Sequence, residues 1–132
     1  MANPVVHFEI MTRGAAALRD FYAKTFGWES QPARGGAGVG DYALVHNESG
    51  IDGGIGEAPE GYAGHVTFYI GVPDIQAALQ TVEKAGGQRM MGPDQVPDGP
   101  IIALFRDPHD HVVGLVETPG LDPDFSLTQT TT

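Results

Sequence analysis

Apolar and polar positions change period several times along the first half of the chain. Residues 4–12 alternate between apolar and polar side chains, which predicts a strand. Residues 14–26 repeat at a helical period, which predicts an amphipathic helix that stops at Gly27. The apolar side chains of this helix recur at spacings of three and four: Leu18, Phe21, Tyr22 and Phe26. Shorter strands are predicted over residues 28–33, 41–47 and 51–57, with a loop over 34–40.

The second half begins the same pattern again. Residues 64–72 form a predicted strand, and residues 73–85 a predicted helix with Pro73 in its first turn. One face of this helix is apolar: Ile75, Ala78, Leu79 and Val82. Three more strands are predicted over residues 88–91, 100–106 and 112–117, with a turn over 107–111.

The order is therefore strand, helix and three strands, twice over. His7 and His65 lie early in the first strand of each half, and the closing strands read GIGE (54–57) and GLVE (114–117). Each of these two halves is too short to bury a good core by itself, so we expect both to form one domain over residues 1–118. Its two modules would span residues 4–61 and 62–118. The polar, Thr-rich residues 119–132 are predicted to be a flexible tail.

Composition narrows the range of partners. The 132 residues include 17 acidic and 7 basic side chains, a formal net charge of −10. This negative charge argues against nucleic acids as partners, because phosphate binding needs a basic face, and against anionic membrane surfaces. The absence of Cys rules out disulfides, a thiolate nucleophile and Cys-ligated metals. No apolar run is long enough for a membrane span, and no secretory signal pattern is present, so we expect a cytoplasmic protein.

Several segments resemble one superfamily. They are VVHFEI (5–10), FYAKTFGW (21–28), GHVTFYIGVPD (64–74), FRDP (105–108) and VVGLVE (112–117). Together the segments resemble the vicinal oxygen chelate superfamily, which includes glyoxalase I, extradiol dioxygenases, fosfomycin-modifying enzymes and bleomycin-binding resistance proteins. The resemblance covers residues 4–118. It implies an α+β fold in which two βαβββ modules curve into a half-open barrel sheet with helices on the outside, and it implies a homodimer.

The resemblance also implies a metal site, and this sequence departs from it. Metal-dependent members bind a divalent metal through a His on the first strand of each module and a carboxylate on the last strand. His7 and His65 match the histidines, but Gly54 and Gly114 stand where the carboxylates belong. Glu57 and Glu117 follow three residues later and therefore point to the opposite strand face, so they are not counted as ligands.

Glu9 is the nearest carboxylate that could compensate. It lies two residues after His7 and so shares that strand face. One hypothesis makes it a third ligand, beside His7 and His65, for Ni, Zn, Fe or Mn, or a general base. The alternative is a solvated edge residue or a partner for Arg13. Since two imidazoles alone bind a divalent metal weakly, we expect an incomplete metal site and no cofactor.

The same alternation of faces predicts the lining of a ligand cavity: His7, Glu9, Met11, Gly54, His65, Thr67, Tyr69 and Gly114. The two glycines either widen this cavity or mark bends in the strands. Trp28 and Phe105 are expected mainly to pack in the core. His109 and His111 are read as part of a turn, and His46 as structural.

Three functions fit this pattern. The first is a glyoxalase-like or bleomycin-resistance-like protein that binds a small organic molecule without a complete metal site. The second is a divalent-metal-dependent lyase, isomerase or dioxygenase that uses His7, His65 and Glu9. The third is a catalytically silent partner subunit.

Overall fold

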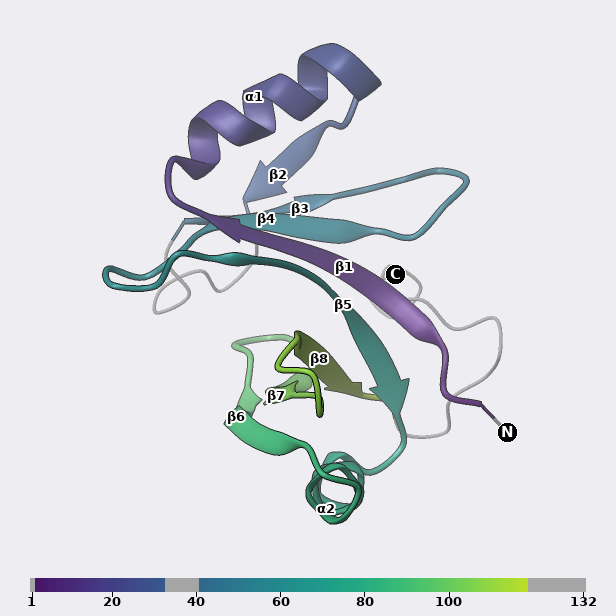
Figure 1. Ribbon diagram of the computed structural model, residues 1–132. Helices are drawn as coiled ribbons and strands as arrows, with labels where there is room; N and C mark the ends of the chain where they lie inside the picture. Colours follow the sequence, from purple (N-terminus) through teal and green to yellow (C-terminus); the bar gives the residue numbers. More distant parts are fainter. Residues whose placement is uncertain (1, 33–40, 119–132) are drawn as a thin grey trace. The chain divides into compact units, whose positions relative to one another are not determined.

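The structure, a computed structural model, describes residues 2–32 and 41–118 (Figure 1). Three predictions lie outside these residues: the strand end at Ala33, the loop over 34–40 and the tail over 119–132. The helices are α1 (Ala15–Phe26) and α2 (Ile75–Lys84). The strands are β1 (Val5–Thr12), β2 (Ser30–Pro32), β3 (Tyr42–Val45), β4 (Gly53–Glu57), β5 (His65–Val72), β6 (Gln88–Gln95), β7 (Ile101–Arg106) and β8 (Val112–Glu117). Within the described ranges, neither helix is long and apolar enough to cross a membrane.

The order of elements confirms the predicted α+β class and its two βαβββ modules. Hydrogen bonds order the strands of the first module as β2-β3-β4-β1, and those of the second as β6-β7-β8-β5. In both modules the last strand runs parallel to the first and antiparallel to the strand before it. In register, Glu9 lies opposite Gly54 and Tyr69 lies opposite Gly114.

The chain divides into two compact units. One contains the described residues between 7 and 66, and the other contains residues 2–6 with 67–118. The first residues thus belong with the second helix, and the Gly71 N–H donates to the Pro4 carbonyl at 2.9 Å. Each unit is described by itself below.

Each unit has its own apolar core beneath its helix. In the unit of residues 7–66, Ile10, Ala15, Val45 and Ile55 are buried, and Phe8, Leu18, Tyr22 and Trp28 pack against them. In the other unit the buried cluster is Val72, Ile75, Leu79, Ala103, Phe105, Val113 and Leu115. The predicted apolar face of α2 is therefore confirmed, as are the core positions of Trp28 and Phe105.

The predicted apolar stripe of α1 is only partly buried. Phe21 is 51% exposed and Phe26 is 66% exposed. Their rings pack on Tyr22, with centroid distances of 5.1 Å for Phe21 and 6.1 Å for Phe26, instead of on the sheet. Small Ala15 makes the fully buried contact of this helix, so the aromatic side chains of the stripe extend beyond the core.

Most element bounds differ from the predictions by one or two residues, and β6 ends four residues later than predicted. Helix α2 begins at Ile75, because the Asp74 side chain accepts a hydrogen bond from the Ala77 N–H at 3.1 Å and acts as the N-cap. Strand β6 continues past Met91 to Gln95, through Pro93 and two irregularities in its register. Pro lacks a donor, but β6 is the last strand in its order, and an edge strand tolerates that loss.

Glu57 and Glu117 each close a module by binding the start of its helix. The Glu57 carboxylate accepts from the Ala15 N–H at 2.9 Å and from the Gly14 N–H at 3.1 Å. The Glu117 carboxylate accepts from the Ile75 N–H at 3.0 Å. The first N–H groups of a helix have no partner within it and carry partial positive charge, so a carboxylate stabilises them. These two acids therefore serve the helices, as their strand parity predicted, and not a ligand.

The hydrogen bonds from Ala15 and Gly14 lower the pKa of Glu57, with Arg13 and Arg19 adding in the same direction. Because the folded-state pKa is depressed, the stabilisation exists above the unfolded value of 4.5 and disappears as pH falls through the folded value. We expect Glu57→Gln to lower the free energy of unfolding in urea at pH 7 and to match the wild type at strongly acidic pH. Glu60→Gln, at an exposed position, is the matched control. Equal losses for both variants at pH 7 would contradict the capping role.

Candidate functional site

Glu9 is a carboxylate buried on one face of β1. Only 7% of the residue is exposed. Glu9 Oε2 accepts a hydrogen bond from His65 Nε2 at 2.7 Å, and Oε1 accepts one from the Tyr42 hydroxyl at 3.1 Å. A buried charge is costly unless it is paired, and these two donors supply that pairing. Both alternatives for Glu9 are wrong: its burial contradicts a solvated edge residue, and Arg13 pairs with Glu57 and donates to the Ala58 carbonyl.

The hydrogen bonds continue on both sides of Glu9. The Tyr62 hydroxyl lies 2.6 Å from His65 Nδ1, and His7 Nε2 lies 3.2 Å from the Tyr42 hydroxyl. The result is a polar chain that we call the Glu9 network: Tyr62, His65, Glu9, Tyr42 and His7. All five residues lie within the unit of residues 7–66.

The carboxylate fixes the direction of these hydrogen bonds. An ionised carboxylate only accepts, so His65 Nε2 and the Tyr42 hydroxyl both donate to Glu9. The Tyr42 oxygen is then left to accept from His7 Nε2. A neutral His65 has its proton on Nε2, so its Nδ1 accepts from the Tyr62 hydroxyl. In this arrangement each of these hydrogen bonds is donated in the direction of Glu9.

His7 is held in its neutral form by its surroundings. Burial lowers its pKa below the usual value, while the carboxylates of Glu9 and Asp52 act in the opposite direction. Burial has the larger effect on this pKa, because removing a charged imidazole from water costs more free energy than its attraction to the two carboxylates provides. A neutral His7 with its proton on Nε2 matches the donor that the Tyr42 oxygen requires.

The expectation that Gly54 and Gly114 leave room in a cavity is wrong. The Tyr42 ring lies over Gly54 and Gly56, and a Cβ at Gly54 would collide with the Tyr42 phenol. In the other unit the Tyr69 ring lies over Gly114 in the same way. A glycine on a strand lets a neighbouring ring approach the backbone closely. Tyrosine rings therefore fill the space beside both glycines.

The residues of the described chain do not fit the divalent metal that the resemblance implies. At Gly54 and Gly114, tyrosine rings occupy the space where carboxylates would project. His65 Nε2 and Glu9 Oε2, two candidate donor atoms, bind each other. Within the described ranges no group of three or more His, Asp or Glu side chains is arranged to hold a metal ion.

Two glycines fix the loop that carries Tyr62. Gly61 and Gly64 both have positive φ, at 87° and 106°. Gly64 also approaches the Met11 carbonyl so closely that a Cβ would collide with it. The Tyr62 N–H donates to the Pro59 carbonyl at 3.0 Å, which closes the turn. The backbone thus places Tyr62 three residues before His65 in a defined position.

The remaining candidates have other surroundings. Met11 is half-buried beside Gly56 on the Tyr42 side of β1. In the other unit the buried Thr67 hydroxyl donates to the Val112 carbonyl at 2.5 Å. His46 lies 3.3 Å from the Asp52 carboxylate, as a structural role would require. His109 and His111 are exposed in the turn, where Asp107 binds the His109 N–H and the His111 ring.

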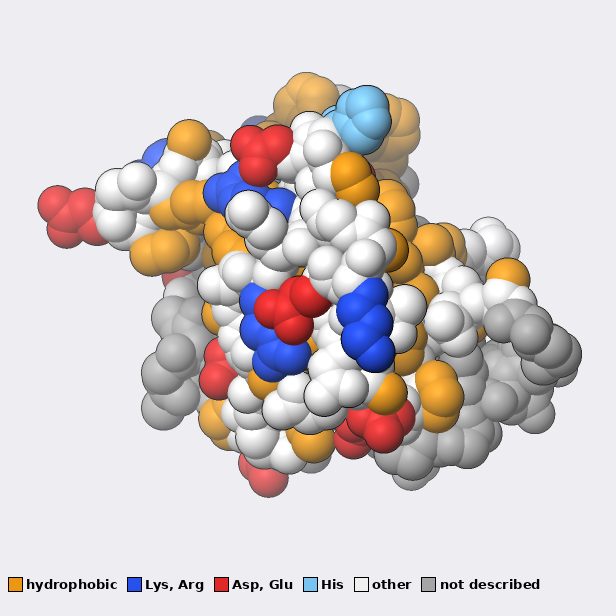
Figure 2. Space-filling view, turned by 60° about the horizontal axis from the view of Figure 1, so that its bottom comes forward, with side chains coloured by type: hydrophobic (Ala, Val, Ile, Leu, Met, Phe, Trp, Pro, Cys, Tyr) orange, Lys and Arg blue, Asp and Glu red, His pale blue; other side chains and the backbone are white. Residues whose placement is uncertain are grey.

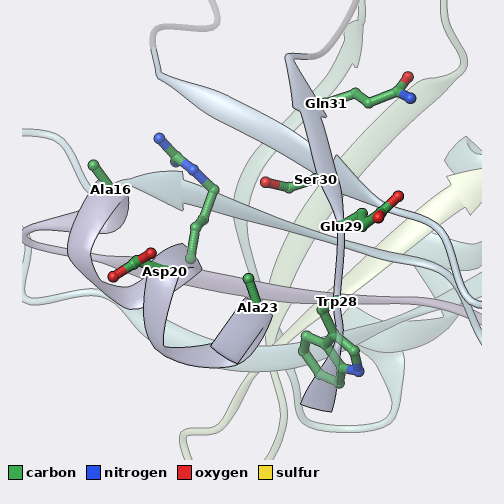
Figure 3. Close-up of a pocket in the computed structure, with 8 residues that line it drawn as sticks. Ala16, Asp20, Ala23, Trp28, Glu29, Ser30 and Gln31 are labelled. Atoms are coloured by element: carbon green, nitrogen blue, oxygen red, sulfur yellow. The ribbon is translucent and has the colours of Figure 1, made fainter. Parts of the chain in front are cut away.

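An open groove of about 490 Å³ lies between α1 and β2 (Figure 3). Its lining consists of Ala16, Arg19, Asp20, Ala23, Trp28, Glu29, Ser30 and Gln31. Arg19 also forms an ion pair with Asp41 at 3.1 Å, and Asp20 forms one with Lys24 at 2.8 Å. The groove therefore contains no member of the Glu9 network, and its charged walls are largely paired.

Basic side chains lie beside acidic ones on the face that Figure 2 shows. Among the described residues, Arg89 pairs with Glu83 at 3.3 Å and Arg106 with Asp110 at 3.4 Å. On the face in Figure 2, positive and negative side chains are therefore interspersed.

Sequence reasoning missed Tyr42 and Tyr62. Only a general tendency pointed to Tyr42: aromatic residues often cover glycines on a neighbouring strand, but the register that pairs Tyr42 with the glycines of β4 is not set by either strand alone. Tyr62 gives no periodic signal, since it lies in a loop. Its position depends on the turn that Gly61 and Gly64 form.

A family model of the Glyoxalase/Bleomycin resistance protein/Dioxygenase superfamily matches residues 5–115. The chain belongs to this superfamily. It is 32% identical over 111 residues to the Mycobacterium bovis protein named "Putative glyoxylase CFP32", covering 81% of this chain and 42% of that protein. The chain thus spans about two-fifths of that relative. It is also 32% identical over 109 residues to a glyoxylase-like domain-containing protein of Didymella fabae, covering 77% of this chain and 81% of that one.

Among solved structures of superfamily members, Streptomyces coelicolor methylmalonyl-CoA epimerase in complex with 2-nitronate-propionyl-CoA matches with a TM-score of 0.63. The alignment covers 92% of this chain and 99% of the epimerase, at 17% identity. At this identity the likeness establishes the glyoxalase-type fold alone.

The glycine–tyrosine contact predicts a local intolerance to any side chain at position 54. Gly54→Ala should lower the free energy of unfolding by about 1–3 kcal/mol, because its Cβ overpacks against Tyr42. Gly50→Ala is the control, since a Cβ there meets only the Asn47 Cβ at 3.9 Å. Urea denaturation measures both. In a Tyr42→Ala background the cost of Gly54→Ala should shrink, and an unchanged cost would contradict the contact.

Proposed function

We propose that the protein binds a small organic molecule, without a metal, through the Glu9 network. The observation that carries this proposal is glycine under a tyrosine ring at each of the two carboxylate ligand positions, together with the hydrogen-bonded His65–Glu9 pair in the unit of residues 7–66. The network supplies imidazole and phenol groups in place of a metal ion. Such groups orient hydroxyl or carbonyl oxygens of a ligand by hydrogen bonding.

The charge at the centre of the network favours one kind of ligand. Glu9 is a buried carboxylate, and the chain as a whole has a net charge of −10. A carboxylate or phosphate placed beside Glu9 would be repelled in this low-dielectric setting. A neutral ligand with hydroxyl or carbonyl groups avoids that penalty. The ligand proposed for this protein therefore differs in charge from 2-nitronate-propionyl-CoA, the ligand of the similar epimerase structure.

The metal content of the protein tests this proposal. Protein purified without a metal-affinity tag should contain far less than one Ni, Zn, Fe or Mn per chain by mass spectrometry of the elements. Stoichiometric metal that disappears in the His7→Ala/His65→Ala variant would overturn the proposal. That result would instead support the metal-dependent lyase, isomerase or dioxygenase that uses His7, His65 and Glu9.

Ligand binding tests the role of the phenol. Neutral hydroxylated or carbonyl compounds that raise the melting temperature should bind Tyr42→Phe about three- to tenfold more weakly, the usual effect of one lost hydrogen bond. Tyr22→Phe is the matched control, because Tyr22 packs on Trp28 in the helix core. Equal binding by both variants would place the ligand elsewhere. No ligand together with a constantly co-purifying protein would favour the silent partner subunit.

We also propose that the protein is a cytoplasmic homodimer. The exposed aromatic side chains of α1, Phe21 and Phe26, support self-association because burying them in an interface removes apolar surface from water. Sedimentation velocity should give twice the chain mass of 13.9 kDa. A single species of the chain mass at micromolar concentration would contradict the dimer.

A further inference from the structure

A carboxylate, an imidazole and a phenol are joined in series at one end of the Glu9 network. Glu9 Oε2 lies 2.7 Å from His65 Nε2, and His65 Nδ1 lies 2.6 Å from the Tyr62 hydroxyl. Both ring nitrogens of His65 are therefore engaged, one with an acid and one with a hydroxyl. This is the order of groups that activates a hydroxyl in nucleophilic and acid–base enzymes: an orienting acid, a base and a hydroxyl.

The supporting contacts hold this series in one geometry. Glu9 and His65 side chains are each 9% exposed, so water competes little for their hydrogen bond. Tyr42 holds the second Glu9 oxygen, which prevents the carboxylate from turning away from His65. Gly61 and Gly64 set the turn that carries Tyr62. The His65 ring therefore meets a fixed donor on one side and a fixed acceptor on the other.

Tyr62 is the end member of the series, and we expect a ligand to meet the series there. Glu9 is buried, whereas His65 and Tyr62 are half-buried, and Tyr62 lies in the loop before β5. Its ring meets the His65 ring edge to face, with centroids 5.6 Å apart and planes at 70°. Protein atoms thus shield most of the His65 imidazole, and the Tyr62 phenol would carry a proton between it and a ligand.

We propose that Tyr62 is a catalytic acid–base residue, activated by His65, which Glu9 positions. This inference rests on the metal-free site proposed above and adds proton transfer to it. As the Tyr62 proton moves to His65 Nδ1, the Tyr62 oxygen accepts a proton from the ligand, whose electron pair stays on the ligand as an anion. The new imidazolium lies against the Glu9 carboxylate. The reverse transfer returns the proton, so no oxidant or further reactant is needed.

The chemistry of this relay selects a ligand class. Imidazole is a base of moderate strength, so a relay that ends on an imidazole suits the transfer of weakly acidic protons. The C–H between two carbonyl groups and the O–H of an enol or phenol are of this kind. The expected ligand is therefore a neutral 1,3-dicarbonyl compound or a related enol, and the expected reaction is isomerisation by proton transfer.

Phenylmethanesulfonyl fluoride tests the activation of Tyr62 without knowledge of the ligand. The Tyr62 oxygen would bond to sulfur as the S–F bond breaks, with fluoride leaving and the phenol proton passing to His65. Peptide mass spectrometry compares the labelling rates of Tyr62 and Tyr22, another half-buried tyrosine of the same unit. At pH 7 we expect Tyr62 to label at least about tenfold faster, since a positioned base contributes about a hundredfold or more.

The pH dependence distinguishes activation from simple exposure. Labelling of a free tyrosine peptide rises steeply between pH 7 and 9, because the phenolate fraction grows with pH. Labelling of Tyr22 in the protein is compared with that slope, whereas labelling of Tyr62 should change little. Glu9→Gln and His65→Gln, checked for folding by circular dichroism, should reduce the Tyr62 rate toward that of Tyr22. If either variant unfolds, the wild-type pH profiles alone decide. Equal rates with equal slopes, or no labelling of Tyr62, would overturn the proposal even if the protein is free of metal.

Discussion

The burial of one charge, that of Glu9, is the constraint on which the rest of the site depends. An ionised carboxylate with little access to water is stable only if its oxygens are bound by donors. His65 and Tyr42 provide these donors. Tyr42 reaches Glu9 because Gly54 has no side chain to hold the ring away. His7 Nε2 in turn forms a hydrogen bond with the Tyr42 hydroxyl. Each residue of the site thus depends on its neighbour, either for a hydrogen bond or for the space that its side chain occupies.

The acidic residues of the modules divide into two kinds by strand face. Glu57 and Glu117 point toward the helices and bind their first N–H groups. Glu9 points to the opposite side, among aromatic and imidazole groups. In a superfamily usually associated with metal ligands, proximity of an acid to a ligand position is therefore a poor guide to its role. The parity of the strand decides whether the carboxylate stabilises the fold or belongs to the site.

The sequence predicted most elements of the fold because period and length separate strands from helices well. Parity on β1 also placed His7 and Glu9 on one face. It could not predict that the Tyr42 ring covers Gly54, since this depends on the register between β3 and β4. Tyr62 is set by loop geometry, and the length of β6 by the tolerance of an edge strand for Pro93. These properties arise from contacts between elements, which no single segment encodes.

The pairing of glycine with tyrosine also has an evolutionary consequence. A carboxylate cannot return at position 54 while Tyr42 covers the strand, and losing Tyr42 first removes a donor from Glu9. The same steric obstacle stands at Gly114 under Tyr69. Either order of substitution passes through a less stable protein. A protein with this glycine–tyrosine packing therefore cannot gain a carboxylate at these two positions by one substitution without losing stability.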